Sequence, residues 1–207
     1  WRYSGSGLLL RDTSHILRSL HVVEGAGRVR VSFPSGESYA CRVVAKDANN
    51  DLALVRLEGM RPRAEGFTVD PRTRIEVGEQ VHALGYPLGP GLSRRPSIVS
   101  GQVNADTGPR DNIAQFRMTS RIQEGSSGGP VVNSKGLLVG IASSGFVRKG
   151  VVRARFGAKV SAASLILERA RLVQRFDVRV ERREKASYTP QEIFREFSPY
   201  VVLIETQ

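Results

Sequence analysis

The sequence predicts an all-β protein built of two six-stranded barrels, and three observations lead to this fold class. Short runs of β-forming residues recur along the chain and are separated by Gly, Pro, Asn or Asp. Extended and helical patterns do not alternate, as they would in an α/β protein. The chain has 207 residues, 40% of them apolar, which is long enough for one two-lobed domain. We therefore expect antiparallel barrels followed by a C-terminal helix.

The expected strands form two groups on either side of a connecting segment. The first lobe, about residues 1–68, contains five of them, at 7–10, 15–19, 29–33, 38–47 and 51–58. Residues 59–79 contain several Pro and Gly and are interpreted as the crossing between lobes. The second lobe, about residues 78–160, contains six strands, at 80–86, 97–105, 114–120, 130–133, 137–146 and 152–160.

The remaining residues predict a helix, a linker and a second helix that leads into a strand. Apolar residues at helical spacing indicate a helix over 161–176, and 177–188 is a mixed-charge linker. Thr189, Pro190 and Glu192 form a capping-box pattern for a short helix before a strand at 200–205. This strand could be the missing sixth strand of the first lobe. Three explanations stay open: a circular permutation, the start of a second tandem domain, or a strand exchanged between molecules.

Composition excludes several function classes. The net charge of +11 is carried mainly by arginine, but the arginines are scattered and no aromatic-basic motif accompanies them, so nucleic acid is not expected as the primary partner. Cys41 is the only cysteine, which excludes an intramolecular disulfide. We expect no metal or cofactor, because no metal-ligand spacing is present, and no membrane span, because no apolar run approaches about 20 residues.

Oligomeric state and compartment stay open: a cytoplasmic protein and an exported one with its signal peptide removed are both compatible with the sequence.

The run Gly125-Ser126-Ser127-Gly128-Gly129-Pro130 is the strongest candidate for a reactive site. A serine between glycines in a tight bend can expose its hydroxyl and direct backbone N–H groups to one point. The pattern Gly125-x-Ser127-x-Gly129 also matches the nucleophile elbow of α/β-hydrolases, which requires a histidine after the serine. The histidines here, His15, His21 and His82, all precede Ser127. The order His, Asp, Ser is that of chymotrypsin-like barrels.

Six motifs in the same order resemble the trypsin-like serine proteases, and most of all their disulfide-free HtrA (Deg) branch. That branch reads roughly GSG, ILTNNHVV, DLALL, GNPLG, GNSGGPLVN and VIGI. The matching segments here are Gly5 to Gly7, Ile16 to Val23, Asp51 to Leu54, Gly85 to Gly89, Gly125 to Asn133 and Leu138 to Ile141. The resemblance implies a protease domain over residues 1–176, with 189–207 completing the first barrel or beginning another domain.

The resemblance also implies a serine endopeptidase that acts on protein or peptide substrates. Ser127 would be the nucleophile, His21 the general base and Asp51 the residue that orients the imidazole. The N–H groups of Gly125 and Ser127 would form the oxyanion hole.

Substrate would bind as an added strand along Ser143, Ser144 and Gly145. Arg121 and Arg155 align with specificity-pocket positions, which predicts a preference for acidic P1 residues because a buried guanidinium needs a counter-charge. The residues Arg18, Ser19 and Leu20 depart from the family's usual run before the histidine. The alternative function is therefore a catalytically inactive module that binds peptides or partner proteins by strand addition.

Overall fold

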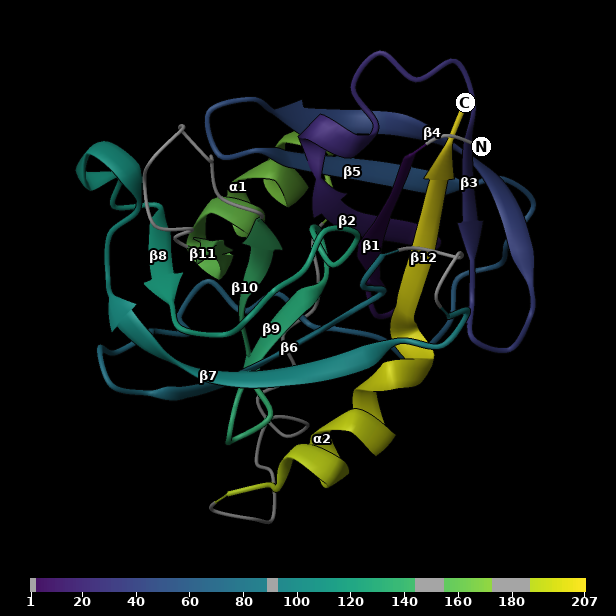
Figure 1. Cartoon of the computed structure of the whole chain (residues 1–207). Helices are drawn as coiled ribbons and strands as arrows, with labels where there is room; N and C mark the ends of the chain where they lie inside the picture. The colour runs from purple at the N-terminus through teal and green to yellow at the C-terminus, as the bar shows by residue number, and fades with distance from the viewer. Residues whose placement is uncertain (1–2, 89–92, 144–154, 173–186) are drawn as a thin grey trace.

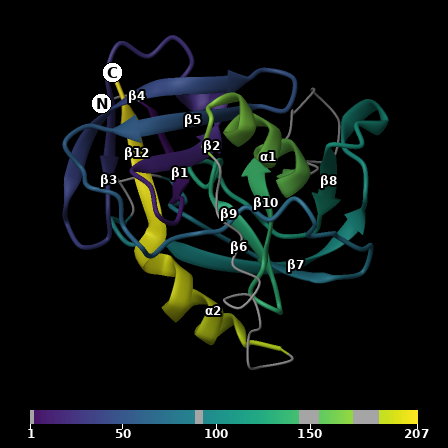
Figure 2. The same ribbon diagram turned by 180° about the vertical axis from the view of Figure 1, so that it is seen from behind.

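Two closed antiparallel barrels of six strands each form the molecule, which confirms the fold class predicted from the sequence (Figure 1). The computed structural model describes residues 3–88, 93–143, 155–172 and 187–207. The two barrels lie against each other, α1 packs beside β10 and β5, and α2 lies at one end of the molecule (Figures 1 and 2). Among the described helices, none is both long and apolar enough to cross a membrane.

The first barrel has the strand order β1-β12-β3-β4-β5-β2. Its strands are β1 (Tyr3–Leu9), β2 (His15–Ser19), β3 (Val29–Ser32), β4 (Ser38–Asp47), β5 (Leu52–Leu57) and β12 (Val201–Thr206). A 3-10 turn, η1 (Leu20–Val22), follows β2 directly. The five strands expected in the first lobe are all present, with ends shifted by a few residues.

The second barrel has the strand order β10-β11-β8-β7-β6-β9. Its strands are β6 (Gln80–Gly85), β7 (Ser97–Ala105), β8 (Gln115–Met118), β9 (Pro130–Asn133), β10 (Leu138–Ser143) and β11 (Arg155–Lys159). A short 3-10 turn, η3 (Pro109–Asp111), lies between β7 and β8. The expected strands at 137–146 and 152–160 extend into residues 144–154, which lie outside the described part of the chain.

β12 closes the first barrel from the opposite end of the sequence. It pairs antiparallel with β1 on one side, where Tyr3 lies opposite Thr206. On its other side it pairs antiparallel with β3, where Val29 lies opposite Thr206. Every residue of β12 is buried. The first described residue, Tyr3, therefore lies beside Thr206 at one end of the barrel (Figure 1). Closure leaves no unpaired strand edge in this barrel, which removes a common route to aggregation.

Alternation along the strands divides the apolar residues among three cores. Successive residues of a strand point to opposite faces, so Leu9 lies inside the first barrel while Leu8 and Leu10 face the space between the lobes. The interior of the first barrel also contains Ile16, Val31, Val55, Val202 and Ile204, and that of the second contains Val81, Val103, Phe116, Val131 and Val139. The third core joins both barrels to α1 and α2, which fixes the lobes relative to each other.

The helix expected over 161–176 is shorter in the structure. α1 runs over Val160–Arg169, and Arg171 has a left-handed backbone with φ 56°. The N–H of Leu172 donates to the carbonyl of Leu167, and that of Arg171 to Glu168, both at 2.9 Å. This pattern is a Schellman motif, which ends a helix whatever the polarity of the following residues.

The second helix begins as its capping pattern predicts. α2 (Pro190–Phe197) has Thr189 as N-cap: its hydroxyl accepts from the Glu192 N–H, and the Glu192 carboxylate accepts from the Thr189 N–H. The 3-10 turn η4 (Ser198–Tyr200) then leads into β12. Phe197 stacks on Phe67 with ring centroids 5.0 Å apart. The helix is thus anchored to the inter-lobe core at the point where β12 begins.

Candidate active site

His21 and Asp51 form a directly hydrogen-bonded pair. His21 lies in η1, after β2, and Asp51 lies in the turn before β5, with φ 53°. The His21 Nδ1 is 2.7 Å from Asp51 Oδ2, and the His21 backbone N–H donates to Asp51 Oδ1 at 2.9 Å. A carboxylate only accepts hydrogen bonds, so the shared proton belongs to Nδ1. This tautomer leaves Nε2 as the basic nitrogen of the ring.

The Asp51 carboxylate receives a third hydrogen bond from the second barrel. The Ser143 hydroxyl donates to Asp51 Oδ2 at 3.1 Å. Burial, the largest influence, raises the pKa of Asp51. The hydrogen bonds and charge of His21, together with the Ser143 hydroxyl, outweigh burial and hold that pKa below its usual value. Asp51 is thus ionised at neutral pH and fixed in position by groups from both lobes.

The segment 125–130, here called the nucleophile loop, has the backbone that its glycines predict. Gly125 and Gly128 have φ values of 91° and 89°, which side-chain-bearing residues rarely adopt. A Cβ on Gly128 would collide with the Ser6 carbonyl and would lie 2.9 Å from the Ser19 nitrogen. Ser127 is 3% exposed. Glycine is therefore required for this loop to lie between the two barrels.

The nucleophile loop lies beside the end of the strand that leads to His21. The carbonyl of Ala142 accepts from the Gly128 N–H at 2.7 Å and from the Ser19 hydroxyl at 3.2 Å. Ser19 is two residues before His21 in the chain. The structure therefore brings His21 and Ser143 each into contact with Asp51 and places the loop that carries Ser127 next to them.

Ser6, in the matching segment Gly5 to Gly7, is a residue of this region to which the sequence interpretation assigned no role. It is fully buried on β1. Its hydroxyl donates to the Gly125 carbonyl and accepts from the Tyr86 N–H, both at 2.8 Å, and its own N–H donates to the Ser127 carbonyl at 2.8 Å. Ser6 thus links the first barrel to the nucleophile loop and to Tyr86, the residue that follows β6. Its position between two glycines, in a strand that must approach another backbone, was the available signal.

The residues predicted to bind substrate lie in different environments, and two of them lie outside the described part of the chain. Ser143 contacts Asp51 through its side chain, whereas Ser144 and Gly145 lie outside the described residues. Arg155 is half-buried on β11, opposite Met118. Arg121 is exposed. The assumption that Arg121 is buried is therefore wrong: water solvates its guanidinium, which needs no acidic counter-charge.

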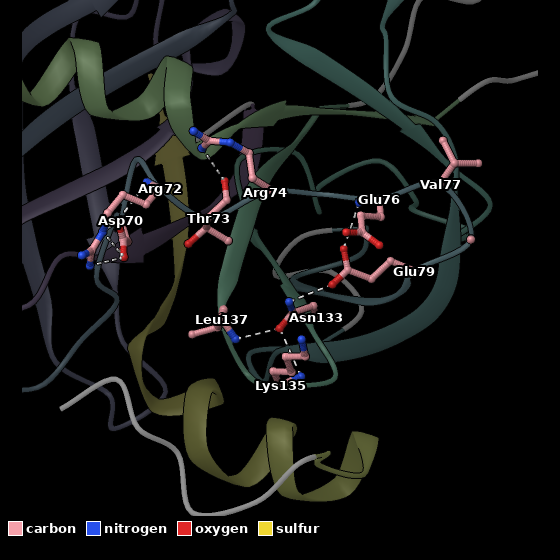
Figure 3. Close-up of a pocket in the computed structure, with 11 residues that line it drawn as sticks. Asp70, Arg72, Thr73, Arg74, Glu76, Val77, Glu79, Asn133, Lys135 and Leu137 are labelled. Atoms are coloured by element: carbon pink, nitrogen blue, oxygen red, sulfur yellow. Dashed lines mark hydrogen bonds and ion pairs between the residues drawn. The ribbon is translucent and has the colours of Figure 1, made fainter. Parts of the chain in front are cut away.

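A separate groove of about 1060 Å³ lies between the inter-lobe segment and the turn after β9 (Figure 3). Its polar groups are largely paired with one another: Arg72 with Asp70 at 2.7 Å, and the Asn133 amide with Glu79 at 2.9 Å. The residues that line it also include Thr73, Arg74, Glu76, Val77, Lys135 and Leu137. No predicted site residue is among them, so we do not include this groove in the candidate site.

Comparison with known proteins agrees with this geometry. Residues 5–141 match the family model described as trypsin-like peptidase domain. A probable periplasmic serine endoprotease, DegP-like, from Halomonas elongata is 33% identical over 150 residues, which are 72% of this chain and 31% of that protein. Protease Do-like 1, chloroplastic, from Arabidopsis thaliana is 30% identical over 141 residues, 67% of this chain and 32% of that protein.

A solved structure agrees with these sequence relatives. The crystal structure of the serine endoprotease from Yersinia pestis superposes with a TM-score of 0.68 at 25% identity, covering 82% of this chain and 58% of that one. The chain spans about a third of the length of the two curated relatives named above. The resemblance to trypsin-like, HtrA-type proteases is thereby confirmed.

Proposed function

The chain belongs to the family of trypsin-like peptidase domains, and on that basis we propose that it is a serine-type endopeptidase with Ser127, His21 and Asp51 as its catalytic residues. One observation carries the assignment of residues: the His21–Asp51 pair, joined at 2.7 Å, lies beside the glycine-rich loop that contains Ser127. A pair of this kind orients an imidazole as a general base.

The proposed reaction begins when the Ser127 hydroxyl attacks the carbonyl carbon of the scissile peptide bond. His21 Nε2 takes the hydroxyl proton, while Asp51 accepts from Nδ1–H and stabilises the imidazolium that forms. The N–H groups of Gly125 and Ser127 stabilise the oxyanion of the tetrahedral intermediate. This intermediate releases the amine, which receives the proton from His21, and leaves an acyl-enzyme. Water, deprotonated by His21, then attacks the ester carbonyl; the carboxylic acid product leaves as the Ser127 oxygen takes the proton back from His21.

The peptide substrate binds as an added strand along Ser143, Ser144 and Gly145. Because Arg121 is exposed, any preference for acidic P1 residues depends on Arg155, which is half-buried. A peptide library that varies P1 tests this: selective cleavage after Asp or Glu, lost in Arg155→Ala, supports it. Cleavage after small apolar or basic residues contradicts it.

A fluorophosphonate probe tests the function without knowledge of the natural substrate. We expect the wild-type protein to be labelled, Ser127→Ala not to be labelled, and the matched control Ser126→Ala to be labelled as the wild type. His21→Ala should slow labelling by at least about 10³, because the hydroxyl loses its general base. A folded wild-type protein that takes up no label, yet binds extended peptides, would instead support the inactive binding module. Labelling that persists in Ser127→Ala would contradict the assignment of the nucleophile.

A further inference from the structure

Arg18, on β2, is a fully buried cation that the proposed mechanism does not use. It is 0% exposed and is the largest side chain enclosed to this degree in the described part of the chain. Its Nε donates to the Ser19 carbonyl at 2.8 Å, whereas Nη1 and Nη2 have no acceptor among the described residues. Burial lowers its pKa to about 9, against the opposing influence of Asp51 and Cys41. Arg18 therefore stays positively charged at neutral pH.

The guanidinium lies under the turn that carries His21. Ile16 and Arg18 share one face of β2, and Ile16 belongs to the first-barrel core, so Arg18 points into the end of that barrel nearest η1. A Cβ on Gly5 would lie 2.9 Å from Arg18 Nη2 and 3.1 Å from a methyl carbon of Val22, the residue after His21. Gly5 thus leaves the room that the guanidinium occupies between β1 and this turn.

The stem of Arg18 also lies beside the nucleophile loop. Its Cβ is 3.2 Å from the position that a Cβ on Gly128 would take. A buried guanidinium with unpaired N–H groups is costly, and an apolar side chain of the same size would avoid this cost. Arg18 therefore does not serve stability at this position, and its charge is expected to act on the neighbouring groups.

Few titratable groups share this environment. Residues 5–9 of β1 and the nucleophile loop contribute none, and η1 contributes only the histidine itself. Asp51, in the turn before β5, and Cys41, on β4, are the groups whose charges favour the protonated guanidinium. On β12, Glu205 is paired with Arg30 at 2.8 Å. The Asp51 carboxylate is thus the negative charge on which Arg18 acts most directly.

We propose that Arg18 is a positioning residue that biases the His21–Asp51 pair against taking up a proton and fixes the strand end from which the His21 turn begins. The inference rests on the proposed function. A positive charge near the pair opposes the addition of another, so the pair stays in its active, proton-accepting form to lower pH than it would without Arg18. The bond from Nε to the Ser19 carbonyl restrains the backbone immediately before η1.

The test compares the pH dependence of fluorophosphonate labelling in the wild type, Arg18→Met and Arg18→Lys. Methionine removes the charge and retains an unbranched chain, so we expect the acid limb of the labelling rate to move up by about 0.5–1 pH unit. This shift is a rate loss of roughly 3–10-fold at pH values below the limb. Lysine retains the charge and should leave the limb in place. A limb that is the same within about 0.2 unit in Arg18→Met and wild type would overturn the proposal.

A second measurement separates this inference from the proposed function. The His21 ring signals are followed by NMR against pH in Ser127→Ala, with and without Arg18→Met, and the same upward shift is expected although neither protein is catalytic. If the wild type takes up no label, the proposed function fails, and the NMR shift still decides the role of Arg18. Arg18→Thr, which carries the residue of the family motif at this position, replaces Arg18→Met if the latter does not fold. If neither neutral variant folds, the role of Arg18 is structural and the proposal is wrong.

Discussion

Replacing Ile204 by alanine tests whether β12 is an integral strand of the first barrel. Ile204 is 0% exposed and lies in the core of that barrel with Val202. Its Cδ1 is 2.8 Å from the position that a Cβ on Gly7 would occupy, so it packs closely over β1. The substitution removes three carbon atoms, worth about 2.4 kcal/mol in transfer free energy, and leaves a cavity. We expect the free energy of unfolding to fall by about 3–4 kcal/mol and Tm by roughly 10 °C.

Urea unfolding followed by circular dichroism measures this loss, and Leu165→Ala is the matched control. Leu165 lies on α1 and is 50% exposed, so its truncation should cost less than about 0.5 kcal/mol. A loss below about 1 kcal/mol for Ile204→Ala, with an unchanged m value, would refute the placement of β12 in this barrel. If the strand is instead exchanged between molecules, the loss persists but the unfolding midpoint of the wild type depends on protein concentration.

Three further predictions concern single residues. Burial raises the pKa of the Cys41 thiol to about 12. Iodoacetamide at pH 8 should therefore alkylate the native protein at least about 100-fold more slowly than the protein unfolded in guanidinium chloride. Equal alkylation rates would contradict the burial of this thiol. The pKa of Asp51 lies below its usual 3.8 because the contacts with His21 outweigh burial, so the carboxylate stabilises the fold above about pH 4 and this contribution disappears as the pH falls through the lowered pKa. Urea titrations between pH 5 and 2.5 should show this loss in the wild type and not in Asp51→Asn; parallel pH curves would contradict it. A Cβ on Gly129 would collide with a carbonyl of β6, so Gly129→Ala should lower Tm and abolish fluorophosphonate labelling. Gly27→Ala is the control, because the nearest atom to its added Cβ is 3.5 Å away, and it should change neither property. A stable, labelled Gly129→Ala protein would show that the loop can move.

The sequence was sufficient to predict the strands because apolar alternation and turn residues are local signals. Leu8, Leu9 and Leu10 are all buried, however, and their distribution between two cores follows from the pleat of β1 and not from their hydrophobicity. The end of α1 was missed for a similar reason. The apolar pattern continues to Leu172, but Arg171 takes a left-handed backbone that sequence patterns rarely reveal.

The proposed site residues were named from sequence motifs, whereas the contacts that support them in the structure were not predicted. Ser143 was chosen for its backbone, and its hydroxyl is the group that contacts Asp51. Arg18, in a strand, would ordinarily be placed on the outer face of a barrel, because a lone guanidinium is expensive to bury. Its enclosure depends on the missing side chain of Gly5, 13 positions earlier in the chain. Such pairs become visible only when the strands are placed next to each other.

The contacts of Ser6 make the nucleophile loop dependent on both lobes. The reactive loop belongs to the second lobe, yet two of its carbonyl groups are bonded to a residue of the first. The strand that carries this residue, β1, pairs in turn with β12. Order in the nucleophile loop therefore depends on the first barrel and, through β1, on β12, so the proposed hydrolysis requires both lobes to be assembled.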